Sequence, residues 1–354
     1  MEKSRNEINE VTEEYSSLMP VIISEAKKIA DDCEDFFVKT LKNRMTFTPE
    51  ETIRFEQEDL IRPEVTLKPT EYAFGQLCDK IDFPAKLYRK QTAKLKEGRL
   101  ANTNINTHME HYSGKLMVRT YKNIIRGILS DRYTSFDSDR IIELFAEAIE
   151  DNKDIPVTEL GICGYVNTYE RLHVRIINKT PLEIDGRKAY AGLTINTSDV
   201  GMAKISVKFY IYTGLESNGI CIDQFRSELF EEPHIHISET EIKNRLKQAF
   251  RNFPMIMANA KIYIQNAETF ELTNSALYDE DSVQNRMLSK ILNLTKKDIR
   301  SIIDISEFRP KNLWGYVSSI GEYARTLDFE RRIELERGAG RILLYPDKFG
   351  IVAG

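Results

Sequence analysis

The chain contains 354 residues, of which 41% are hydrophobic and 30% are charged, and its formal net charge at pH 7 is −5. This balance is typical of a globular protein, and the net charge excludes a protein that coats duplex DNA through bulk positive charge. No apolar run approaches the roughly 20 residues that span a bilayer, and the N-terminus lacks the basic-then-apolar order of a signal peptide. We therefore expect a cytoplasmic protein with no membrane contact.

The charges are distributed unevenly along the chain. Residues 1–60 carry 15 acidic and 8 basic side chains, a net charge of −7. Residues 80–133 carry 12 basic and 4 acidic side chains, a net charge of +8. A local basic region of this kind can attract phosphate although the whole chain is acidic.

Residues 1–65 predict an acidic helical leader. Leu18, Ile22 and Ala26 share one helical face, and the apolar stripe continues at residues 36–41. Residues 48–51, Thr-Pro-Glu-Glu, are typical of a helix start with proline at the first helical position. The leader carries no catalytic motif, and a lid, an oligomerisation arm and a packing element all stay open as its role.

Helices and strands then alternate. Thr70 can cap one helix, and Pro84 opens a second, lysine-rich helix that ends at Gly98. Residues 101–112 predict a polar connection. Residues 115–121 and 124–129 predict two strands, and a helix begins near residue 137 or 138.

Three segments in the middle of the chain alternate between apolar and polar residues. In residues 203–213, every second residue from Ile205 to Ile211 is apolar, and the residues between them are charged, hydroxylic or aromatic. Residues 171–177 and 190–196 repeat this pattern. If the segments pair as a meander, one face packs against helices and the other carries cations and aromatic rings.

We expect this second face to be exposed and to bind nucleic acid, because cations hold phosphates and aromatic rings stack on unpaired bases. An ordinary half-exposed sheet gives the same alternation, so that interpretation stays open. The candidate nucleic-acid-binding residues are Arg171, His173, Arg175, Lys204, Lys208, Tyr210 and Tyr212, supported by Arg119, Lys122, Arg126 and Arg132.

From Ser238 onward the chain predicts helices. Residues 238–241 form a capping box, and helices follow near residues 279–293 and 296–303. Asn312 begins a last long helix, which ends at residues 338–340. The predicted fold class is α+β: an antiparallel meander sheet backed by helices. Its parts are the helical leader (1–65), an α+β core (66–235) and a helical C-terminal region (236–354) packed on the core.

No pattern in the chain is typical of a metal or cofactor site. The four cysteines are far apart without CxxC spacing, so we expect reduced thiols. The pairs His108/His111 and His234/His236 have no third ligand at a recognised spacing. Neither GxxxxGK[ST] nor GxGxxG after a strand occurs. We expect no cofactor, no metal and no enzymatic activity, although catalytic residues can also converge from distant positions.

Four stretches together resemble the phage/plasmid-like protein family, a domain of unknown function found on phages, prophages and plasmids. They are TEYAFGQLCDKIDFPAKLYRK (70–90), the strand that leads into LSDRYTSFD (116–137), GLTINTSDVGMAKISVKFYIYTGLESNGI (192–220) and NLWGYVSSIGEYARTLDFERR (312–332). The resemblance spans roughly residues 68–345. It implies a mobile-element context, often near recombination and single-strand-binding genes. Ser217 stands where the family usually has cysteine before Asn-Gly, which argues against a thiol-based mechanism.

Two functions from different classes follow. The first hypothesis is a phage or mobile-element protein that binds single-stranded DNA as a recombination or annealing factor. The alternative is a non-enzymatic protein-interaction factor, such as a phage inhibitor of a host defence or replication enzyme, whose acidic leader mimics nucleic acid. A homo-oligomer is compatible with both. Salt-sensitive DNA binding separates them, because only the first predicts it.

Overall fold

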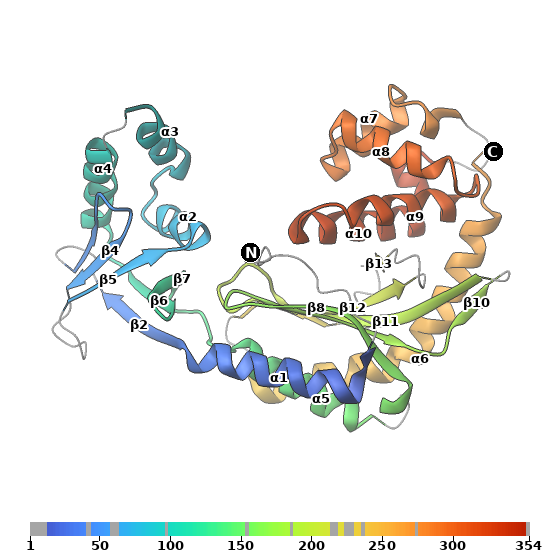
Figure 1. The fold of residues 1–354 in the computed structure, drawn as a ribbon, viewed down its shortest axis with the longest axis horizontal. Helices are drawn as coiled ribbons and strands as arrows, with labels where there is room; N and C mark the ends of the chain where they lie inside the picture. The colour runs from blue at the N-terminus through green and yellow to red at the C-terminus, as the bar shows by residue number, and fades with distance from the viewer. Residues whose placement is uncertain are drawn as a thin grey trace.

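The computed structural model describes residues 13–39, 44–56, 64–95, 98–152, 156–184, 187–212, 219–222, 230–234, 238–272 and 275–351. It contains two β-sheets that lie side by side, each packed against helices (Figure 1). The predicted α+β class is confirmed, as is the helical C-terminal region. Within the described ranges, no helix is long and apolar enough to cross a membrane.

The first sheet has six strands. In spatial order they are β2 (Cys33–Lys39), β6 (Lys115–Tyr121), β7 (Ile124–Ser130), β5 (Glu64–Pro69), β4 (Ile53–Glu56) and β3 (Met45–Phe47). β5 and β7 are parallel, and the other neighbouring strands are antiparallel. The helices of this half are α2 (Glu71–Lys80), α3 (Ala85–Leu95) and α4 (Gly98–His111). α2 packs on β7, α4 packs on β3, and their apolar side chains form one core with the sheet.

Two predictions for this half are wrong. Residues 33–39, 45–47 and 53–56 form strands, not a continuing helix, because Phe36 and Val38 face the core while Phe37 is 41% exposed. Residues 48–51 form the turn between β3 and β4, in which the amide of Thr48 donates to the carbonyl of Thr52 over 2.9 Å. The alternation of buried and exposed side chains along residues 36–38 is therefore that of a strand, and the proline lies in a turn.

The predicted polar connection at 101–112 belongs to α4, and Gly98 begins this helix instead of ending the previous one. Ala101, Ile105 and Met109 recur every four residues and are all buried. The intervening asparagines and threonines hide this stripe in the sequence because they are weak helix formers. One of them, Asn106, exchanges two hydrogen bonds with the backbone of Phe47, of 2.8 and 2.9 Å, and so fixes α4 to β3.

The second sheet has eight antiparallel strands, and its meander was predicted. The main order is β1 (Glu13–Glu14), β8 (Leu160–Asn167), β9 (Leu172–Asn178), β11 (Arg187–Thr197), β12 (Ile205–Tyr212) and β13 (Gly219–Ile222); β10 (Leu182–Ile184) pairs with β11, and β14 (Phe230–Glu232) pairs with β12. The register places Arg175, Thr194 and Lys208 in one row across β9, β11 and β12. His173, Asn196 and Ser206 form the next row.

The apolar face of the second sheet is buried as predicted. Ile205, Val207, Phe209 and Ile211 have no exposed surface, and they belong to one core with the helices beneath. Those helices are α1 (Tyr15–Asp31), α5 (Ser138–Glu150) and α6 (Glu239–Thr269) (Figure 1). The predicted caps at Thr70 and Ser238 are also present, each accepting a backbone N–H from three residues further on.

Helices also cover the opposite face, so the second sheet is the middle layer of three (Figure 1). α9 (Leu313–Ala324) and α10 (Phe329–Leu344) lie on this face, and α7 (Val283–Leu292) and α8 (Lys296–Ser306) pack on these two helices, farther from the sheet (Figure 1). The predicted last long helix is in fact two, because Asp328 caps a new helix and accepts from the amide of Arg331. Residues 338–340 lie inside α10 and do not end it. A Cβ on Gly338 would lie 2.5 Å from Cδ2 of Leu292, so the glycine permits close packing of α10 on α7. Single 3₁₀ turns occupy Val157–Glu159, Ser275–Tyr278 and Pro346–Phe349.

Candidate anion-binding site

The polar face of the second sheet is largely buried, which corrects the expected open platform. Arg171, His173, Arg175 and Lys208 are each less than 10% exposed. The reason lies in α10, which lays carboxylates onto this face. Glu330 and Glu336 thus pair with Arg171 and Arg175, and the cations of this face do not form an open platform for an extended DNA strand.

Glu336 holds α10 on the sheet. Its side chain is fully buried, lies 2.5 Å from Nη2 of Arg175 and accepts a hydrogen bond from Nε of Arg332 over 2.9 Å. Glu330, one helical turn and a half before it, pairs with Arg171. Buried charges persist in proteins when they are paired and hydrogen-bonded in this way.

His173 acts as a neutral acceptor on this face. Burial, together with the charge of Arg175, lowers the pKa of His173 well below its usual value. Its Nε2 lies 3.1 Å from Nε of Arg175, and its ring meets the ring of Phe329 edge to face at 5.2 Å. The predicted role as a cationic or stacking residue on an open surface is therefore wrong.

Lys204 and Lys208 share one carboxylate. Their Nζ atoms lie 3.1 and 3.0 Å from the two oxygens of Glu231 on β14. Partial burial opposes ionisation of Glu231, but the hydrogen bonds and charges of the two lysines prevail and lower its pKa to about 2. Two cations thus face one anion at this edge of the sheet.

The other predicted residues lie apart from this group. Tyr212 is half-buried with its ring 6.4 Å from that of Tyr190, and the side chain of Tyr210 lies outside the described residues, as does His236. Lys122 is exposed and lies 3.2 Å from Asp32, and Arg132 is exposed in the turn after β7.

Arg119 and Arg126 are structural. Both are fully buried where the two sheets meet. Arg119 lies 2.9 Å from Asp35 and also pairs with Asp137, and Arg126 lies 3.0 Å from Asp199. Three segments of the resemblance converge at this junction, since Gln76 on α2 also donates to the carbonyl of Val200 over 2.8 Å. The two predicted phosphate contacts therefore connect the halves of the molecule.

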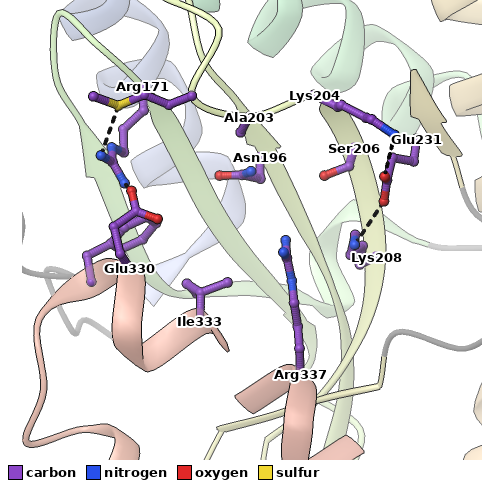
Figure 2. Close-up of a pocket in the computed structure, with 12 residues that line it drawn as sticks. Arg171, Asn196, Ala203, Lys204, Ser206, Lys208, Glu231, Glu330, Ile333 and Arg337 are labelled. Carbon is purple, nitrogen blue, oxygen red and sulfur yellow. Dashed lines mark hydrogen bonds and ion pairs between the residues drawn. The ribbon is translucent and has the colours of Figure 1, made fainter. Parts of the chain in front are cut away.

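A pocket of about 320 Å³ remains open between the polar face and the first turns of α10 (Figure 2). The row of Asn196 and Ser206 lines its wall on the sheet, and Ile333 and Arg337 line its wall on the helix. Its charged side chains are Arg171, Lys204, Lys208, Arg337, Glu231 and Glu330. Among the described residues that line the pocket, four are cations and two are carboxylates.

Arg337 is the distinctive side chain of this pocket. It extends from α10 toward the sheet, and its guanidinium ends between Asn196 and Lys208 (Figure 2). Its Nε is buried without a hydrogen-bond acceptor, and among the described residues no carboxylate lies within ion-pair distance of it. A buried donor without an acceptor is costly, so an anionic ligand is stabilised here. Arg337 is not evident from the sequence because a helix of alternating Glu and Arg does not show which charge faces a pocket.

Comparison of the chain with protein-family models, curated proteins and solved structures found no significant match. The resemblance to the phage/plasmid-like family therefore stays a hypothesis. Among the parts of the chain that the structure describes, no group of three or more metal-ligating side chains occurs.

Proposed function

We propose that the protein binds single-stranded DNA and that the pocket beside Arg337 holds a backbone phosphate. The single observation that carries this proposal is the guanidinium of Arg337 directed at the polar row of the sheet without a carboxylate partner among the described residues. A guanidinium matches the geometry of phosphate oxygens. The proposed setting is the cytoplasm of a cell that carries a phage or mobile element, where such a protein serves recombination or annealing.

The shape of the site favours a single strand over duplex. The pocket is recessed between a sheet and a helix and is large enough for one phosphate with its sugar. A flexible single strand can turn one phosphate inward, whereas duplex phosphates lie on a stiff convex helix. The proposed binding site is therefore a local pocket for one backbone phosphate, in place of the broad platform that the sequence predicted.

The electrostatics favour phosphate as well. Lys208 is buried to 7% exposure and Lys204 is more exposed, and together with Arg337 they line one side of the pocket. Glu231 pairs with both lysines through its two carboxylate oxygens. Because one phosphate displaces its counterion at this pocket, log K should fall with log salt concentration with a slope of about −0.7.

Fluorescence anisotropy with a labelled single strand and with duplex, at low and moderate salt, tests this function. We expect the single strand to bind more tightly than the duplex and Arg337→Gln to weaken binding by roughly tenfold or more. Arg132→Gln, at an exposed site away from the pocket, is the matched control and should bind normally. Absence of single-strand binding at low salt, or equal effects of the two substitutions, would contradict the proposal.

A protein-interaction function is the second candidate, and one feature favours it. A cavity of about 740 Å³ on the first sheet is lined, among the described residues, by Asp31, Asp32, Glu34 and Asp35 and by one cation, Lys122. Such a surface is complementary to a basic protein partner. If DNA binding is absent, co-purification of the wild-type protein but not of an Asp31→Asn/Glu34→Gln variant with a host protein would support this function.

A further inference from the structure

A second pocket lies directly beside the anion-binding pocket. It has a volume of about 690 Å³ and lies between α2 of the first half and residues 168–171, the turn between β8 and β9, in the second half. Ligand sites form preferentially where two structural units meet. Arg171 and Met202 line both pockets, so the two cavities adjoin at these side chains.

The shared wall is held in place. Arg171 pairs with Glu330, its guanidinium lies 4.9 Å from the centre of the Phe329 ring, and its Nη2 lies 3.1 Å from the sulfur of Met202. Across the pocket, Gln76 on α2 accepts from the amide of Ile128 in β7 of the same half, and it joins α2 to the second half by donating to the carbonyl of Val200. A ligand therefore meets a preformed boundary between the two cavities.

The second pocket differs chemically from the first. Its lining includes the rings of Tyr72 and Tyr169, and its charged side chains are Arg89, Arg171, Glu71, Asp79 and Glu170, so carboxylates outnumber cations by one. Tyr169 stacks on Tyr121 with ring centres 4.8 Å apart, which fixes its orientation. Aromatic rings favour a flat, uncharged group, and carboxylates accept hydrogen bonds but donate none. This lining suits a nucleobase better than a second phosphate.

We infer that the second pocket receives the base of the nucleotide whose phosphate occupies the first pocket, and that it favours bases with an exocyclic amino group. This inference rests on the proposed DNA-binding function. Cytosine offers an amino group to a carboxylate such as Asp79, whereas thymine presents a carbonyl at the same position. A carbonyl oxygen facing a carboxylate is repelled, so an oligodeoxycytidine binds more tightly than an oligodeoxythymidine.

Gly75 provides a selective way to block this pocket. It lines the cavity within α2, and a Cβ placed on it would meet no atom within 4 Å. Gly75→Leu therefore extends a side chain into the pocket without a clash at its Cβ, and leucine is a better helix former than glycine. Gly75→Ala adds one methyl group and is the matched control.

The experiment compares labelled oligodeoxycytidine and oligodeoxythymidine of equal length by anisotropy. The wild-type protein should prefer cytidine by roughly tenfold, the value of one well-placed hydrogen bond to a charged group. Gly75→Leu and Asp79→Asn should each reduce this preference to near unity while keeping the salt dependence and the effect of Arg337→Gln. Gly75→Ala should keep most of the preference, and a thermal melt of each variant establishes that it is folded.

The outcomes separate the two proposals. If both oligonucleotides bind equally to the wild-type protein, or if Gly75→Leu keeps the full preference, the base pocket is wrong while phosphate binding stands. If neither oligonucleotide binds at low salt, the proposed function itself is overturned, and the base pocket with it.

Discussion

The carboxylate of Asp199 lies 3.0 Å from Nη1 of Arg126, and this ion pair joins β7 of the first sheet to the turn after β11 of the second. Asp35 and Asp137 complete the cluster around Arg119 at the same junction. Three carboxylates thus face two guanidinium groups, which leaves one excess negative charge in a buried place. This imbalance decides how substitutions and pH affect the molecule.

Replacing Arg126 should destabilise the protein strongly. Arg126→Ala leaves three carboxylates with Arg119 as their remaining guanidinium, and unpairing a buried charge of this kind costs about 3–5 kcal/mol in the free energy of unfolding. Urea denaturation measures the loss. Arg132→Ala, at an exposed position, should change stability by less than about 0.5 kcal/mol. Similar losses for the two variants would show that the junction does not depend on this ion pair.

The excess negative charge predicts a pH dependence centred on Asp199. Burial, and then repulsion by Asp137, raise the pKa of Asp199 to about 6 in the folded protein, compared with about 3.9 in an unfolded chain. The folded state therefore binds this proton more tightly, and its contribution to stability is fully present below about pH 4 and is lost as the pH rises through 6.

The Asp199→Asn variant tests this dependence because its amide has no proton to lose. The free energy of unfolding of the wild type, minus that of the variant, should fall by roughly 2 kcal/mol between about pH 4 and pH 7. Urea titrations across this range measure the difference. If the difference between the two free energies of unfolding does not change across this pH range, Asp199 titrates as an ordinary aspartate.

Glu336 should contribute strongly to the packing of α10 on the sheet. Glu336→Ala removes the carboxylate shared by Arg175 and Arg332, both nearly buried, and should cost about 3–5 kcal/mol. Glu334 lies on the same helix, is 64% exposed and pairs with Arg331, so Glu334→Ala should cost less than about 1 kcal/mol. Chemical denaturation compares the two, and equal effects would contradict the tertiary role of Glu336.

Gly192, in the centre of the second sheet, lies where the neighbouring strand leaves no room for a side chain. A Cβ at this position in β11 would lie 2.0 Å from the carbonyl oxygen of Ile176 in β9, so the strands must move apart. Gly192→Ala should destabilise by about 1–3 kcal/mol or more. Gly75→Ala, which meets open space inside a helix, should instead stabilise by about 0.5–1 kcal/mol. Thermal melts of both variants measure these opposite shifts, and a stable Gly192→Ala would mean that the strands separate at little cost.

Local patterns in the sequence predicted many of the elements correctly. The alternation from Ile205 to Ile211 predicted both the strand and its buried face, and Thr70 and Ser238 cap helices as expected. These features depend on neighbours a few residues away, which a single sequence displays directly. Where two local signals competed, as at residues 33–39 and 101–112, the expectation failed because packing on the first sheet decided between them.

The sequence by itself determined that Arg171, Arg175 and Lys208 share one face of a sheet. Only the tertiary structure decided that this face is covered, because its counter-charges Glu330 and Glu336 come from a helix roughly 160 residues further along the chain. A strand that faces water and a strand that faces a charged helix show the same polar alternation. Whether this face is an open platform or a recessed pocket therefore depends on ion pairs between residues that are far apart in the sequence.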